Sequence, residues 1–182
     1  ETTTNADGVY TASTGSATAG DTYSYGASSS TERALGSIAS GNLLSRYGAQ
    51  FTNNTGNTID QLDISYVGEE WRFDPARGTT IKDQIAFEYS TDATSLTTGT
   101  WTAVTALLYE TTNLTGTVGT RNGNDAAYRT SLSNTITGLN ISAGQTFWVR
   151  FSDINISGTD DGLAVDDFSL TPINSTLSVN DI

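Results

Sequence analysis

The sequence predicts an all-β protein built as an antiparallel sandwich of two sheets. Its polar excess is neutral, with 32 Thr, 20 Ser and 13 Asn against 28 charged residues. Thr suits pleated, half-exposed surfaces, while Asn, Ser and Gly suit turns. No window keeps a 3.6-residue apolar period with capping residues, so the chain contains no convincing helix.

Each predicted strand alternates apolar and polar residues between turn signals. Leu62, Ile64 and Tyr66 alternate with polar neighbours, and Phe147, Val149 and Phe151 do the same around Trp148 and Arg150. Asn53–Asn57 and Ser142–Gly144 are strong turn signals. The predicted strands are 47–52, 62–67, 85–90, 101–108, 136–139, 147–152 and 163–170, with a long loop over 111–125.

A chain of 182 residues fits one domain with a two-layer core. Residues 1–20 are a polar lead, which we expect to lie as an extended edge strand or to be donated to a neighbouring copy. Residues 21–171 form the predicted β-sandwich domain. Residues 172–182, in which Leu177 and Val179 alternate with polar residues, are interpreted as a linker or the start of a following domain.

The charge balance excludes some functions. The net charge is −12, the pI is about 4.1, and Lys82 is the only lysine. Such a surface repels nucleic acid, and no apolar run approaches the length needed for membrane insertion. An acidic surface of this kind attracts divalent cations. The Lys-poor, Thr- and Asn-rich composition predicts a secreted or cell-surface protein.

The segment Gly162–Leu170 carries the first candidate site. Strict alternation would place Asp166 on the same face as Phe168 and Leu170, where a carboxylate needs a counter-ion. The loop before it supplies Asp153, Asp160 and Asp161. Ca²⁺ suits this supply of oxygen ligands. The alternatives are that Asp166 is solvated at the strand end and that the loop acids only form turns.

Five segments in one order resemble a bacterial secreted-domain family found in large surface proteins and beside extracellular nuclease domains. They are Glu32–Ser37, Phe51–Gly56, Ile64–Arg72, Phe147–Arg150 and Asp160–Leu170. The resemblance implies a secreted β-sandwich accessory module without assigned catalytic residues.

The last strand also resembles the closing strand of galactose-binding-like jelly rolls, as in carbohydrate-binding modules and MAM domains. That resemblance implies a jelly-roll fold in which Asp166 holds a structural calcium with ligands from near the first strand. On the N-terminal side the nearest acids are Asp21 and Glu32, and no motif decides between them.

Two tryptophans are candidate sugar platforms. Trp71 shares a strand face with Glu69, and either holds a sugar ring or closes one end of the core. Trp148 and Arg150 lie opposite the Phe147 stripe, so Trp148 either lines a groove or stacks on Arg150 as a structural contact.

These observations predict a non-catalytic adhesion or carbohydrate-binding module with a structural Ca²⁺, whose partner is a polysaccharide or cell-surface glycan. The absence of His and Cys excludes Ser-His and Cys-His nucleophile systems, and no glycosidase motif is recognised, so we predict no enzyme activity. The alternative is a self-assembling subunit of a surface filament or matrix, in which copies are joined by a donated terminal strand.

Overall fold

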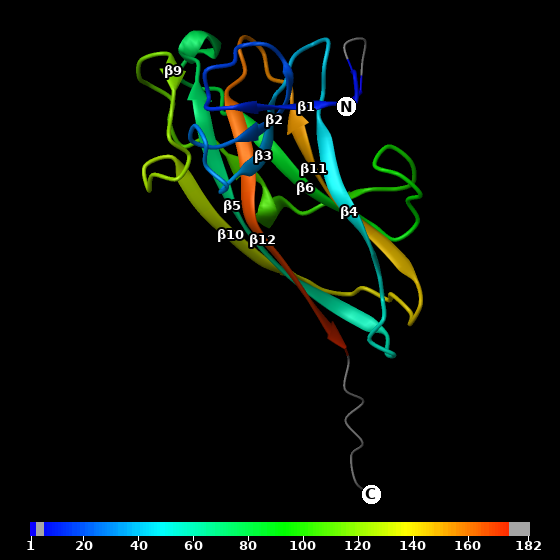
Figure 1. The fold of residues 1–182 in the computed structure, drawn as a ribbon. Coiled ribbons are helices and arrows are strands. Elements are labelled where there is room, and N and C mark those ends of the chain that lie inside the picture. The colour runs from blue at the N-terminus through cyan, green and yellow to red at the C-terminus, as the bar shows by residue number, and fades with distance from the viewer. Residues whose placement is uncertain (3–5, 175–182) are drawn as a thin grey trace, which may run out of the picture.

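The computed structural model describes residues 1–2 and 6–174 and has the predicted jelly-roll sandwich architecture, with two facing sheets (Figure 1). Among these residues there is no α-helix, and so none long and apolar enough to cross a membrane. Two 3₁₀ turns, η1 (Pro75–Arg77) and η2 (Thr105–Leu107), are the helical elements described. The strands are β1 (Tyr10–Ser13), β2 (Asp21–Tyr25), β3 (Ala34–Ile38), β4 (Arg46–Thr52), β5 (Ile59–Phe73), β6 (Gln84–Ser90), β7 (Thr102–Ala103), β8 (Tyr109–Glu110), β9 (Gly119–Thr120), β10 (Arg129–Ile136), β11 (Thr146–Ile154) and β12 (Gly162–Asn174).

The larger sheet is organised around its two longest strands. Its order is β1-β2-β3-β12-β5-β10, and β9 adds to the end of β5. β5 and β12 pair antiparallel from Gly162↔Arg72 to Asn174↔Ile59. The smaller sheet has the order β4-β11-β6-β7, with β8 also on β6. All pairs are antiparallel except β1 with β2, which is parallel.

The alternation read from the sequence decides which side chains enter the core. Leu62, Ile64 and Tyr66 of β5 face Phe147, Val149 and Phe151 of β11 across the sandwich, and all are buried. Burying these faces is the main favourable contribution to folding. The predicted strands are therefore confirmed in β4, β5, β6, β11 and β12, and most are longer than predicted. The strand predicted over 136–139 is wrong, because β10 ends at Ile136 and the three residues after it form no strand.

One long side of the sandwich is closed by the segment that links β6 to β8. The ring of Tyr109 lies where a side chain on Gly68 would stand, because a Cβ there would come within 2.3 Å of the ring. The Tyr66 hydroxyl donates a hydrogen bond to the Leu107 carbonyl at 2.6 Å. The expected strand over 101–108 is instead β7 followed by η2, because this segment turns over the core edge.

A β-bulge changes the predicted facing of the closing strand. The β12–β5 register shifts between Asp166 and Ser169, and Asp167 has a positive φ of 51°. Ala164, before the bulge, packs with Trp71 outside the sandwich, whereas Phe168, after it, packs on Phe87 and Phe151. The prediction that Asp166 shares a face with Phe168 and Leu170 is therefore wrong, because the bulge inserts an extra residue.

The polar lead lies on its own domain. β1 pairs with β2 in the same chain from Tyr10↔Thr22 to Ser13↔Tyr25. The residues after β1 cover Trp71: a Cβ at Gly15 would meet the Trp71 carbonyl at 2.0 Å. Trp71 thus belongs to a second apolar cluster, stacked on Tyr25 at 5.9 Å between ring centroids. The predicted tail 172–182 runs as β12 up to Asn174, and its remainder lies outside the described residues.

Because Trp71 is only 2% exposed, we expect Trp71→Ala to lower the free energy of unfolding by roughly 3–5 kcal/mol through the cavity it leaves. Trp148→Ala, at a half-buried position, should cost distinctly less. Urea unfolding of both variants measures the difference. Equal losses would show that Trp71 is not a core residue.

Candidate functional site

The six predicted metal ligands fall into three separate groups. Asp153, Asp160 and Asp161 lie inside one end of the sandwich, Asp21 lies near the N-terminus, and Asp166 lies with Glu32 on the outer face of the larger sheet. The structure therefore does not bring them into one site.

The first group, here called the interior aspartates, is completed by Asp83, which the sequence analysis missed. Asp83, Asp153, Asp160 and Asp161 are all buried, Asp83 completely. Asp83 comes directly before β6, Asp153 is on β11, and the other two come directly before β12. The four acids thus come from both sheets and lie at one end of the core. The only sequence signal for Asp83 was its place before a buried strand.

Hydrogen bonds hold the interior aspartates in place. The backbone N–H of Asp161 donates to the Asp83 carboxylate, and Ser37 Oγ donates to Asp153 Oδ2 at 2.6 Å. The other carboxylate oxygen of Asp153 is buried without a hydrogen-bond partner. Among the described side chains, no ion pair involves Asp83 or Asp153.

Burial is the main cause of the pKa shifts of Asp83 and Asp153. Burial, opposed in part by the Ser37 hydrogen bond and reinforced by Asp160, raises the pKa of Asp153 to about 7. Burial and then the charges of Asp153, Asp160 and Asp161 raise the pKa of Asp83 well above its usual range. At least part of this group therefore holds protons near neutral pH, unless a cation replaces them.

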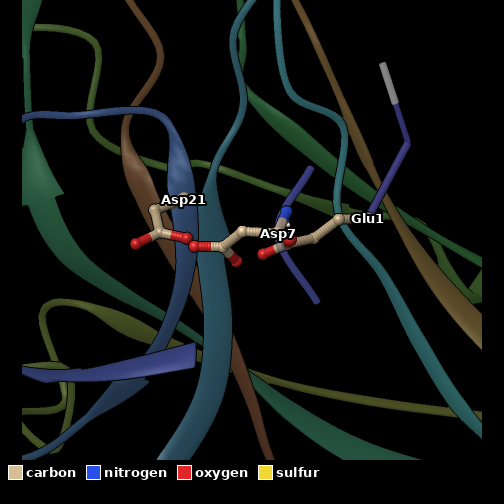
Figure 2. A group of neighbouring side chains, drawn as sticks. All are labelled: Glu1, Asp7 and Asp21. Atoms are coloured by element: carbon tan, nitrogen blue, oxygen red, sulfur yellow. Dashed lines mark hydrogen bonds between the residues drawn. The ribbon is translucent and has the colours of Figure 1, made fainter. Parts of the chain in front are cut away.

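The second group consists of Glu1, Asp7 and Asp21, and Figure 2 shows their carboxylates turned toward one another. One ligand oxygen from each lies within 4.8 Å of the other two. Glu1 Oε2 also accepts hydrogen bonds from the backbone N–H groups of Asp7 and Gly8, at 2.9 and 2.8 Å. Burial, and then the charges of Glu1 and Asp7, raise the pKa of Asp21. Within the described part of the chain, this is the one group of three acids with such convergence.

The third group lies outside the core and has a basic neighbour. Asp166 is half-buried beside Glu32, and burial is the main cause that raises its pKa. Arg129 Nη2 lies 3.2 Å from Asp167 and 3.8 Å from Glu69, so an arginine supplies positive charge to this face. The Glu69 carboxylate also accepts a hydrogen bond from the Trp71 indole at 2.9 Å.

The aromatic candidates are less exposed than a sugar platform requires. Trp71 closes one end of a core, which is the alternative the sequence left open. Arg150 is buried, donates to Glu88 at 2.6 Å, and stacks 3.8 Å from the ring centroid of Trp101 instead of on Trp148. Trp148 does lie opposite the Phe147 stripe as predicted, but it is half-buried and its indole nitrogen is covered.

A polar pocket of about 300 Å³ opens at the same end of the sandwich as the interior aspartates. Arg72, near the end of β5, lines it, and its side chain makes no hydrogen bond or ion pair with any described residue. Thr159 Oγ1 is likewise buried without a partner. The remaining lining comes from the segment before β2, from β3 and the turn after it, from the residue after β5 and from the loop before β12. It consists of Thr18, Gly20, Ile38, Ala39, Ser40, Gly41, Asp74, Asn155, Ile156, Gly158 and Asp160. We call this the end pocket.

The sequence did not predict the end pocket as a site. Two of its residues appear in the sequence analysis for other reasons: Arg72 ends one of the segments that carry the family resemblance, and Asp160 belongs to the loop proposed for calcium. No sequence spacing connects Arg72 with residues 155–160, because the β5–β12 pairing alone brings them together.

Comparisons with known proteins do not assign this chain to a family. No protein-family model matches this sequence, and no curated protein matches it. Among solved structures, the chain is similar to TmCBM61, determined in complex with β-1,4-galactotriose, with a TM-score of 0.43 and 12% sequence identity. The likeness covers 80% of this chain and 74% of that chain. At this level it carries no argument about what the present chain binds.

The pKa of Asp153 predicts how stability depends on pH. Because the folded carboxyl holds its proton to about pH 7 while the unfolded carboxyl loses it near 3.8, folding stability should fall as pH rises between these values. Asp153→Asn is neutral throughout and should remove this dependence. At pH 8 in chelator it should be the more stable protein by up to roughly 4 kcal/mol, and at pH 4 the difference should be small.

Urea unfolding across pH 4–8 measures the effect. A parent protein that gains stability over this range, or a variant with an unchanged slope, would contradict the assignment.

Proposed function

We propose that the chain is a non-catalytic extracellular adhesion module that binds a neutral glycan in the end pocket. The observation that carries the proposal is the Arg72 side chain, which lines the pocket, carries five N–H donors and has no hydrogen-bond or ion-pair partner among the described residues. A buried or half-buried guanidinium gains most when a ligand supplies the missing acceptors.

The mixture of donors and acceptors favours a polyol over other ligands. Asp74 and Asp160 also line the pocket, and their carboxylates carry the opposite charge to Arg72. The lining therefore offers both hydrogen-bond acceptors and hydrogen-bond donors. A sugar hydroxyl both donates and accepts, and so satisfies both kinds of group. An anionic ligand would meet these two carboxylates and a net charge of −12, which oppose its binding.

Substitutions in the end pocket test the proposal. We expect Arg72→Ala to weaken binding at least tenfold to any neutral glycan that the parent protein retains on a glycan array, as measured by calorimetry. Thr159→Val, which keeps the side-chain shape and removes a hydroxyl that is buried away from solvent, should leave the affinity unchanged. Lys82→Ala is the matched control, since it also removes one positive charge but from an exposed pair with Glu110.

Two results would contradict this proposal. One is unchanged affinity of Arg72→Ala for every glycan that binds the parent protein. The other is loss of binding in Trp148→Ala but not in Arg72→Ala, which would move the site to the sequence-predicted platform on the smaller sheet. The bound glycan should also keep its chain length on long incubation, because the module is proposed to bind and not to hydrolyse.

We propose further that a structural Ca²⁺ binds between Glu1, Asp7 and Asp21. Three carboxylates within 4.8 Å repel one another unless a cation or protons lie between them. Ca²⁺ accepts six to eight oxygen ligands and takes the rest from backbone carbonyls and water. An ion here would fix the polar lead against β2, whose first residue is Asp21.

Chelation tests the calcium proposal. Saturating Ca²⁺ should raise the melting temperature by roughly 5–10 °C relative to chelator, because the ion binds only the folded state. Asp21→Asn should abolish the shift, and Asp63→Asn, which removes an exposed acid on β5, should leave it intact. A melting-temperature shift that survives Asp21→Asn but is lost in Asp153→Asn would place the ion among the interior aspartates instead. The absence of any shift in the parent protein would reject the calcium proposal.

A further inference from the structure

The two long sides of the sandwich are closed unequally. On the β10 side, Leu107 and Tyr109 cover the core, as described above. On the other side, where β4 borders the smaller sheet and β12 borders the lower part of the larger sheet, no described segment lies across the gap. Figure 1 shows β4 (cyan) and β12 (red) as the strands that border this side.

The open side forms an apolar slot of about 230 Å³ between the sheets, here called the side slot. Phe168 and Leu35 are large apolar side chains on its rim and are 37% and 38% exposed. Ala49 of β4 stands opposite Val149 of β11 and is exposed, although it points to the core side. No charged residue lines the slot. Apolar surface left uncovered in this way marks an interaction site.

Backbone groups along the slot are also unpaired. β3 pairs with β12 only from Leu163 to Val165, so the β3-side edge of β12 is uncovered beyond the bulge. β4 pairs with β11 alone. Strand edges with free N–H and C=O groups, flanking an apolar floor, fit an extended peptide with apolar side chains at alternate positions. A glycan or lipid would not match both features.

We propose that the side slot binds a strand donated by a second copy of this chain, namely residues 176–180. This segment lies outside the described residues, and in sequence it places Leu177 and Val179 two residues apart between Thr, Ser and Asn. On an extended strand both apolar side chains point the same way, and therefore toward the slot floor. Residues 176–180 carry no charge, and neither does the lining of the slot. This contact therefore avoids the repulsion that a net charge of −12 produces between copies of the molecule.

We take the donor to be a second copy because a tight hairpin would not bring these residues of the same chain to the exposed rim of the slot. In a tight hairpin with β12, Leu177 would stand opposite Asn174 and Val179 opposite Pro172, short of the exposed rim at Phe168. Pro172 also lacks the N–H that such a hairpin would use. The N-terminal lead is not the donor, since β1 is already paired with β2 in its own chain.

Donation of this kind joins unlike surfaces of neighbouring copies. The tail of one copy fills the slot of the next, so the contact is heterologous and repeats into a filament unless a ring closes. The inference does not depend on glycan binding, because the end pocket and the side slot are lined by different residues.

A complementation experiment tests the proposal. One variant lacks residues 175–182 and so keeps an intact slot without a donor. The other carries Ala49→Arg, which fills the slot with a charged side chain at an exposed position but keeps the donor. Light scattering after size exclusion should show concentration-dependent assembly of the parent protein, monomers of each variant alone, and a 1:1 heterodimer of the mixture. Leu35→Glu serves as a second blocked variant should Ala49→Arg fail to fold.

A synthetic peptide of residues 172–182 provides the direct measurement. It should bind the truncated variant, and a peptide with Leu177→Ser and Val179→Ser should bind at least tenfold more weakly. Assembly that survives the truncation, or a parent protein that stays monomeric at millimolar concentration, would overturn the proposal. A monomeric parent that excludes the peptide, beside a truncated variant that binds it, would show that the slot is filled by its own chain.

Discussion

The long antiparallel pairing of β5 with β12 is the constraint on which the rest of the structure depends. It joins the middle of the sequence to its last described strand, and one end of it carries Arg72 beside the loop of Asp160. The bulge at Asp166 and Asp167 then divides β12 into two parts that face opposite ways. Before the bulge the strand supports the outer cluster around Trp71, and after it Phe168 returns to the core between the sheets. A single inserted residue thus lets one strand serve two apolar clusters.

Several acidic residues are buried at one end of the sandwich, where burial of a charged carboxylate is unfavourable. Asp83 and Asp153 are buried at one end of the core, and their raised pKa values mean that the neutral form is favoured there. Backbone N–H groups and the Ser37 hydroxyl satisfy several of the carboxylate oxygens. Hydrogen bonds and protonation therefore stabilise the buried acids. The carboxylates of Glu1, Asp7 and Asp21 are partly exposed instead, and their oxygens lie close enough together to bind one cation.

The scaffold separates its two candidate binding surfaces. The end pocket is polar and built from the ends of strands and the loops between them, where a small number of side chains decide ligand chemistry. The side slot is apolar and built from strand edges, where backbone hydrogen bonds determine what fits. The proposed glycan site and the proposed contact between copies therefore share no lining residues.

The sequence by itself determined the fold class and most strands, because alternation of apolar side chains along β5, β6 and β11 is a local property that burial enforces. It also identified Asp153, Asp160 and Asp161 as acids in one loop region, and it left open whether Trp71 belongs to a core. It did not reveal the bulge after Asp166, the place of Asp83 beside Asp153, or the pocket that Arg72 and Thr159 both line. These depend on strand register and on pairing between residues far apart in sequence, which no local pattern encodes. Only the tertiary structure could therefore separate the predicted calcium ligands into three groups and move the sugar-binding proposal from the tryptophans to the end pocket.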